Sequence, residues 1–305
     1  MASTSQSHLR FLGQSRAYGG RAAVLFMAGF GLCWAIAEDV FGTHLQHSYG
    51  LTQIVWMRYA VHLAIVFLLW GWHEPSRIWR TERPVFHLAR SLMMLIMPLS
   101  FAWAFVHGVP AALTSALFWI TPVLVILLAI GWRRERPSRL IWVGIALGTL
   151  GTFAIVSQSL PTLPGIPLAP LVMALSFSAY VVMTRFLRTE HVEANLFYTA
   201  VGVFAILSLL VPRGWVTPSV HDIEMIVGIG TFGFVSLLML DRAVSHAPVS
   251  RTSPALYTQL AFAALIGIFA SGHRPSLHTL AGLVLIVGAA ALAWALPDAK
   301  DAPSA

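Results

Sequence analysis

The chain has 305 residues, of which 57% are hydrophobic and only 10% are charged. Soluble domains carry about 25% charged residues, so this composition argues against a water-soluble globular protein. The 19 Lys and Arg outnumber the 12 Asp and Glu, but the basic residues cluster in short stretches between apolar blocks. That distribution indicates membrane topology rather than a nucleic-acid surface. The single cysteine, Cys33, cannot form an intrachain disulfide.

Apolar blocks of about 18 to 22 residues follow one another along the chain, and this is the length at which a helix crosses a bilayer. Ten helices are predicted, at 21–42, 51–72, 86–107, 110–131, 140–157, 167–187, 195–212, 223–244, 249–270 and 277–296. No segment alternates with period two, as the strands of a lipid-facing barrel must. The sequence therefore predicts an all-α integral membrane protein with ten transmembrane helices.

The basic residues also predict the orientation of the bundle. Most of them fall in the N-terminal tail (1–20), in the loops that follow even-numbered helices, or in the C-terminal tail (297–305). On the other side the loops carry only Arg213 and Arg274. Because cytoplasmic loops carry the excess of Lys and Arg, we expect a multi-pass protein of the inner (plasma) membrane with both termini cytoplasmic.

A signal peptide is the competing interpretation of the first apolar block. Residues 22–37 follow a basic tail, and Ala35-Ile36-Ala37 has the small-x-small form of a cleavage site. The tail is long, however, and the apolar run continues into Val40 and Phe41. Cleavage would also leave nine helices and break the charge pattern, so a retained first helix is favoured.

The two halves of the chain repeat each other. Identical residues recur at one offset of 138 positions, namely Pro110/Pro248, Thr114/Thr252, Ser115/Ser253, Arg136-Pro137-Ser138/Arg274-Pro275-Ser276 and Gly144/Gly282. A weaker match at an offset of 146 aligns Ala28 and Trp34 with Ala174 and Tyr180. We therefore expect two five-helix units, 21–157 and 167–296. Five is odd, so the second unit enters the membrane from the opposite side, as in the inverted repeats of many secondary transporters.

Residues 111–156 and 249–294 look like the two EamA repeats of the drug/metabolite transporter superfamily. Each has a small-residue helix, a mid-helix proline, a polar loop containing Arg-Pro-Ser and a glycine-bearing helix. Arg58, in Trp56-Met57-Arg58-Tyr59, resembles the arginine that such proteins often carry in their second helix. One departure is His273, where the family commonly has an acidic residue. The resemblance implies a ten-helix carrier of small organic molecules, with some members exporting amino acids and others carrying nucleotide-derived metabolites.

Charged residues within the predicted helices are few. Each costs about 2.5–3.5 kcal/mol on insertion scales unless it finds a partner or a watery cavity. Glu38 and Asp39 lie in the outer part of the first helix, and Arg58 and His62 share a face of the second. Adjacent helical residues point about 100° apart, so one carboxylate can pair with Arg58 while the other faces a cavity. The pair is either structural or part of a vestibule that binds a proton or a charged substrate group.

Helices 110–131 and 249–270 each combine hydroxyl groups, an aromatic side chain and a proline that frees backbone carbonyls at membrane depth. Tight helix packing would explain the same residues equally well. The candidate substrate-binding residues are Trp34, Glu38, Asp39, Arg58, His62, Trp103, Thr114, Ser115, Trp119, Tyr180, Thr252, Ser253, Tyr257 and Gln259. Met93, Met94 and Met97 are expected to fill space, and Arg90, Arg251, Asp241 and Arg242 to reach toward the membrane surface.

We expect a secondary transporter that moves an amino acid or a related zwitterionic or cationic metabolite, because Glu38 and Asp39 are the deep carboxylates. The alternatives are a channel or an intramembrane enzyme. The chain has no H-E-x-x-H, G-x-S-x-G or P-loop, and nothing resembles a carbonyl filter. No catalytic residue, metal, cofactor or nucleic-acid partner is expected. The expected partners are a small-molecule substrate and the bilayer, with coupling to a proton or a counter-substrate left open.

Overall fold

The computed structural model describes residues 19–73, 75–157, 167–271 and 274–297. Regular structure in these ranges is entirely helical, as expected where water is absent and each backbone polar group needs a partner within its own segment. The described residues contain ten helical segments long and apolar enough to cross a membrane. They are Gly20–Leu45, Leu51–Gly71, Pro84–Val106, Leu113–Arg133, Arg139–Val156, Leu168–Phe186, Val192–Leu210, Ile223–His246, Val249–Ala270 and Leu277–Ala295. The predicted ten-helix membrane fold is confirmed.

Several of these spans are irregular. In chain order the elements are α2 (Gly20–Ala35), the π-helix η1 (Ile36–Gly42), α3 (Thr43–Leu45), α4 (Leu51–Val66), the π-helix η2 (Phe67–Gly71), α5 (Pro75–Trp79), α6 (Pro84–Val106), α7 (Ala111–Phe118), α8 (Thr121–Arg133), α9 (Arg139–Val156), α10 (Leu168–Phe186), α11 (Val192–Leu210), the short η4 (Val211–Gly214), α12 (Ile223–His246), α13 (Val249–Leu256), α14 (Thr258–Ser271) and α15 (Leu277–Ala295). The fourth and ninth spans are interrupted at equivalent places, between α7 and α8 and between α13 and α14.

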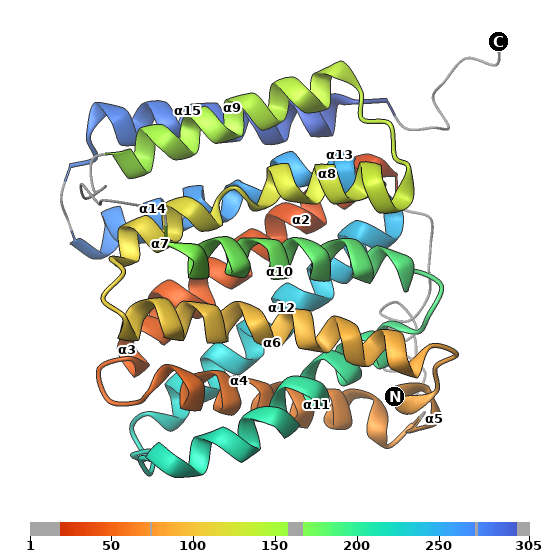
Figure 1. Cartoon of the computed structure of the whole chain (residues 1–305), viewed down its shortest axis with the longest axis vertical. Helices are drawn as coiled ribbons and strands as arrows, with labels where there is room; N and C mark the ends of the chain where they lie inside the picture. The colour runs from red at the N-terminus through yellow and green to blue at the C-terminus, as the bar shows by residue number, and fades with distance from the viewer. Residues whose placement is uncertain (1–18, 74, 158–166, 272–273, 298–305) are drawn as a thin grey trace, which may run out of the picture.

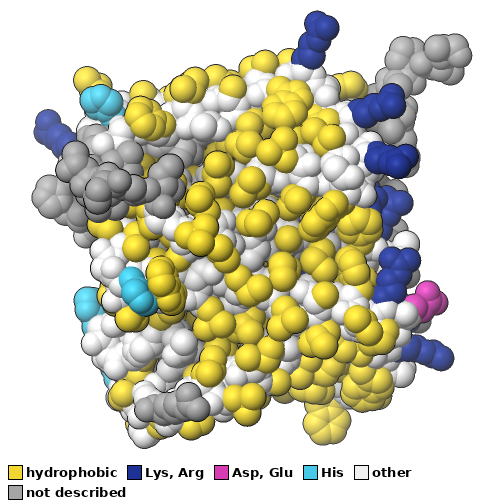
Figure 2. All heavy atoms as spheres, in the orientation of Figure 1, with side chains coloured by type: hydrophobic (Ala, Val, Ile, Leu, Met, Phe, Trp, Pro, Cys, Tyr) yellow, Lys and Arg dark blue, Asp and Glu magenta, His cyan; other side chains and the backbone are white. Residues whose placement is uncertain are grey.

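The helices run back and forth between two ends of the bundle (Figure 1). We call one the arginine end, because its loops and helix termini carry Arg77, Arg80, Arg83, Arg133, Arg134, Arg136, Arg139 and Arg188. The other, the opposite end, holds the turns at 43–50, 107–110 and 215–222. Figure 2 shows a band of apolar side chains beside the row of basic ones. α2 starts at the arginine end and α10 at the opposite end, so the two sets of five helices are inverted (Figure 1).

Glycines let the two outermost helices, α9 and α15, approach each other closely (Figure 1). A Cβ atom added to Gly151 would lie 2.8 Å from the carbonyl oxygen of Gly282, and one added to Gly282 would lie 2.6 Å from that of Gly151. Membrane helices associate largely through such close backbone packing, since lipid provides little hydrophobic drive between them. This contact therefore holds the fifth and tenth spans together.

We predict that Gly151→Leu destabilises the protein, because the side chain must push the two backbones apart. Overpacking costs about 1–3 kcal/mol or more, so the melting temperature in detergent should fall by several degrees. The matched control is Gly131→Leu on α8, where an added Cβ meets nothing within 4 Å. Equal melting temperatures for the two variants would contradict the packing role.

A buried polar cluster lies in the arginine-end half of the bundle. Arg90 is 1% exposed and donates hydrogen bonds to Thr184 Oγ1 at 3.2 Å and to the carbonyl oxygen of Asn195 at 2.5 Å. The side-chain amide of Asn195 donates to Asp241 Oδ1 at 2.8 Å, and Asp241 is 4% exposed. The expectation that Arg90 and Asp241 reach toward the membrane surface was wrong. Internal partners meet the cost of burying these charges, so they do not need the headgroups.

A second polar cluster joins two turns at the opposite end. The carboxylate of Asp222 accepts hydrogen bonds from Tyr49 Oη and Ser219 Oγ, each at 2.6 Å, and lies 3.3 Å from His44 Nε2. The hydrogen bonds from Ser219, Tyr49 and His44 favour the ionised form, so the pKa of Asp222 is lower than its ordinary value. This tie connects the turn between the first two spans to the start of α12.

The lowered pKa of Asp222 predicts a pH-dependent contribution to stability. In the unfolded chain the group keeps its ordinary pKa of about 3.9, so the contribution is fully present above about pH 4. It is lost as pH falls through the lower pKa of the folded state. The difference in melting temperature between the wild type and Asp222→Asn should therefore shrink as pH falls from 6 toward 3. A constant difference over that range would contradict this, and the exposed Glu224→Gln serves as the control.

Candidate functional site

A cavity of about 370 Å³ lies in the half of the bundle nearest the opposite end. This volume is within the range of about 300–1,000 Å³ that is typical of small-ligand sites. The lining residues lie near the middle of their spans or nearer the opposite end, and the exposed Thr43 and Gln46 stand at the mouth of the cavity. The cavity therefore opens toward the opposite end.

Aromatic, polar and other apolar side chains form the wall of the cavity. The aromatic members are Trp34, Tyr59, Phe101, Phe118 and Trp119, and the polar or charged members are Glu38, Asp39, Thr43, Gln46, Arg58, Thr114, Ser115 and Gln259. Met94, Met97, Pro98, Met173 and four aliphatic residues complete the wall. Predominantly apolar walls with a few polar groups are usual in sites for organic ligands.

The π-helix η1 places both acidic residues of the first span. π-turns are rare and occur often at functional sites, and η1 spans Ile36–Gly42 near the end of the otherwise α-helical segment Gly20–Leu45. Its wider turn brings successive side chains closer in direction than an α-helix does. Glu38 and Asp39 both line the cavity as a result, yet they meet different partners.

Glu38 is paired with Arg58 of α4. Arg58 Nη1 donates a hydrogen bond to Glu38 Oε1, and the Arg58 side chain is 6% exposed against 35% for that of Glu38. The guanidinium carbon of Arg58 also lies 4.4 Å from the centre of the Trp34 ring and 5.8 Å from that of Tyr59. Removal of one partner from such a pair leaves an uncompensated buried charge. The Glu38–Arg58 pair thus joins the first two spans at the cavity wall.

Asp39 has no such partner. It is exposed at the cavity wall, and no ion pair or hydrogen bond to its carboxylate occurs within the described part of the chain. Glu38 and Arg58 cancel in formal charge, so an ionised Asp39 gives the wall a net charge of about −1. The arrangement favours a ligand that carries a positive charge.

The interrupted fourth and ninth spans supply further residues of the wall. Thr114 and Ser115 come from α7, Trp119 from the break before α8, and Gln259 from the start of α14. Discontinuous helices at membrane depth are tolerated where they line a cavity, and they are a recurrent feature of transporter binding sites.

Of the residues expected at the site, the cavity brings together Trp34, Glu38, Asp39, Arg58, Thr114, Ser115, Trp119 and Gln259. The remaining ones lie elsewhere, and the reasons differ. His62 is buried behind the wall, stacked on Tyr59 and edge-on to Phe234. Trp103 is 52% exposed on the outside of the bundle, where it stacks on His107 with the two ring centres 3.8 Å apart.

The other four expected residues lie deeper, toward the arginine end. Tyr180 is buried with its hydroxyl 3.3 Å from Thr199 Oγ1. Thr252 and Ser253 are fully buried, and both hydroxyls donate to the carbonyl oxygen of Val249. Tyr257 is buried against α9, with its hydroxyl 2.9 Å from Thr149 Oγ1.

Sequence reasoning missed several residues of the wall. Tyr59 follows Arg58 directly, and Met94, Met97 and Phe101 share one face of α6 by i, i+3 and i+4 spacing. That spacing was visible in the sequence, but it is equally typical of a packed core. Met94 and Met97 were expected only to fill space in the core, but they line the cavity.

The ten-helix fold, the inverted halves and the cavity that opens toward one end are together typical of a secondary transporter of small metabolites. The family model of the EamA-like transporter family matches residues 21–157 and 163–295. The chain therefore belongs to the EamA-like transporter family, and it is a transporter of the drug/metabolite type rather than an enzyme.

Curated relatives and a solved structure are similar to this chain over most of its length. The S-adenosylmethionine uptake transporter of Rickettsia felis is 24% identical over 255 residues, covering 83% of this chain and 86% of that protein. The pseudopaline exporter CntI of Pseudomonas aeruginosa is 25% identical over 238 residues, covering 77% of this chain and 83% of that protein. A solved structure described only as "Crystal structure of protein" superposes with a TM-score of 0.76 at 19% identity, over 89% of this chain and 96% of that chain. This last similarity concerns the fold alone.

Proposed function

We propose that this protein is a secondary transporter of a cationic or zwitterionic amino-acid derivative, and that the cavity is its substrate site. It works by alternating access in the inner membrane, with the arginine end and both termini in the cytoplasm. The observation that carries the proposal is Asp39, an unpaired carboxylate on the wall of an aromatic cavity at membrane depth.

Charge complementarity supports a positively charged substrate. At a separation of about 4 Å and an effective dielectric constant of about 20, two opposite charges attract by about 4 kcal/mol, which partial exposure to water reduces. The faces of Trp34, Tyr59 and Trp119 add attraction for a cation. The hydroxyls of Thr114 and Ser115 and the amide of Gln259 can hydrogen-bond the polar groups of the same molecule.

S-adenosylmethionine has the chemistry that this wall would recognise. It combines a sulfonium cation with an amino-acid group and an adenine ring, and its net charge near pH 7 is about +1. The sulfonium and the ammonium suit Asp39, and the adenine suits the aromatic rings. The Rickettsia felis relative has S-adenosylmethionine in its name, which makes this compound the first one to test.

The direction of transport is a separate question. One of the two relatives is named for uptake and the other for export, so membership of the family does not decide it. No nucleotide-binding motif occurs in the sequence, so the driving force is a proton, a counter-substrate or the substrate's own gradient. Asp39 would bind either a proton or a cationic substrate, and the two would compete for its carboxylate.

The first test is uptake of labelled S-adenosylmethionine into proteoliposomes. We expect saturable transport that unlabelled S-adenosylmethionine inhibits and glutamate does not. Asp39→Asn should raise the KM about tenfold or more, because the charge that attracts the substrate is lost. Glu224→Gln, at the same end but outside the wall, is the matched control and should leave the KM unchanged.

Three outcomes would contradict the proposal. Conductance that rises without saturation would favour a channel. Transport by Asp39→Asn with an unchanged KM would remove the role of that carboxylate. A thermal-shift screen in which anionic metabolites, and no cationic ones, stabilise the protein would reverse the charge assignment, since a bound substrate stabilises the folded state by mass action.

A further inference from the structure

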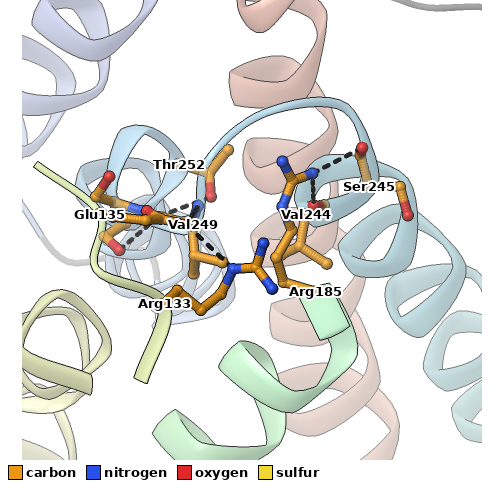
Figure 3. A network of polar contacts seen from close by, with 9 residues as sticks. Arg133, Glu135, Arg185, Val244, Ser245, Val249 and Thr252 are labelled. Carbon is orange, nitrogen blue, oxygen red and sulfur yellow. Dashed lines mark hydrogen bonds and ion pairs between the residues drawn. The ribbon is translucent and has the colours of Figure 1, made fainter. Parts of the chain in front are cut away.

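Charged side chains hold the connection between α12 and α13 from two sides at the arginine end (Figure 3). Arg185, on α10, donates hydrogen bonds from Nη1 to the carbonyl oxygens of Val244 at 2.5 Å and Ser245 at 2.7 Å. Glu135, in the loop between α8 and α9, accepts hydrogen bonds from the backbone N–H groups of Val249 at 3.3 Å and Ser250 at 2.9 Å. Both sets of bonds join this connection to elements far from it in sequence.

The signs of the two charges match the helix ends that they contact. The last carbonyls of α12 carry partial negative charge and accept from the cationic Arg185, while the first N–H groups of α13 carry partial positive charge and donate to the anionic Glu135. Hydrogen bonds to charged groups are stronger than neutral ones. Arg133 Nε lies 3.7 Å from Glu135 Oε1, and the Arg133 guanidinium carbon lies 4.7 Å from the centre of the Phe186 ring. Arg133 therefore contacts both Glu135 and the end of α10.

These contacts lie on the side of the bundle where the cavity is shut. α13 continues into α14, which carries Gln259 and the ninth-span part of the cavity wall, and Glu135 follows α8 of the broken fourth span. α8 and α13 also contact each other directly. Separation of these two half-helices would open a path from the arginine end, and the bonds of Glu135 oppose such a separation.

The positions of the internal repeat that correspond to Glu135 and Arg185 carry other residue types. At the offset of 138, Glu135 corresponds to His273, which lies outside the described residues. At the offset of 146, Arg185 corresponds to Asp39. An aspartate cannot donate to helix carbonyls as Arg185 does, and a histidine cannot bring the charge of Glu135 to a helix N-terminus. At the aligned positions the first and second halves therefore carry different side chains, and the cavity opens at the opposite end.

We propose that Glu135 and Arg185 form a lock that keeps the arginine end closed in the substrate-free protein, and that transport requires the lock to break. This rests on the alternating-access part of the proposed function. Because the lock closes the arginine end, the resting protein faces the opposite end. Weakening the lock shifts the population toward the state that opens at the arginine end.

Ser115 and Ser253 provide matched reporters, since they are equivalent positions of the repeat. Ser115 is exposed at the cavity, and Ser253 is 0% exposed beside the lock. In a Cys33→Ala background, Ser115→Cys should react quickly with a hydrophilic thiol reagent and Ser253→Cys slowly. Glu135→Gln should raise the rate at position 253 and lower that at position 115, changing the ratio of the rates roughly tenfold.

Arg185→Gln should act in the same direction as Glu135→Gln, and Arg185→Lys should largely restore the wild-type ratio because it keeps a cationic donor. Glu82→Gln, an exposed charge at the same end, should leave the ratio unchanged. A loss of fold would raise labelling at both reporters, so the reciprocal change separates unlocking from unfolding. If Glu135→Gln folds and leaves the ratio unchanged, the lock is refuted. Failure of the proposed function would instead appear as absent transport by wild-type protein in proteoliposomes.

Discussion

The cost of placing charge at the depth of hydrocarbon organises this molecule. Each ionisable group between the ends must find a partner, and most of the described ones do so inside the bundle: Arg58 with Glu38, Arg90 with Asn195, Arg185 with the carbonyls of α12. Asp39 departs from this rule, because an open cavity keeps it near water instead. This unpaired carboxylate is the basis of the proposed cation site.

Much of the architecture could be predicted from the sequence. The number of spans follows from apolar block length, and the inversion follows from an odd number of helices per repeat. The offset of 138 also aligns the two interrupted spans, whose breaks lie at Trp119–Ile120 and at Tyr257. These features depend on composition and spacing over many residues, so an error at one residue changes little.

The site was harder to predict because it depends on the direction of single side chains. Phe101 and Trp103 are two residues apart on α6, and the first faces the cavity while the second faces outward. Helical periodicity places them on opposite faces of α6, but it does not tell which face packs toward the cavity. Likewise, the choice of Glu38 over Asp39 as the partner of Arg58 depends on a π-turn that no residue pattern in the segment announced. The burial of Arg90 and Asp241 depends on partners from two other helices, Thr184 on α10 and Asn195 on α11.

The π-turn in the first span has a consequence for how binding preferences could change between related chains. A π-turn holds one residue more than an α-helical turn, so deletion of a single residue within Ile36–Gly42 could restore regular α-helix. Residues beyond the deletion would keep nearly the same direction relative to those before it, because the π-turn accommodates its extra residue within one turn. Only the side chains within the turn, Glu38 and Asp39 among them, would change direction, and this would happen without any amino-acid substitution. In this segment, a length change is a more abrupt route to a new ligand than a point mutation.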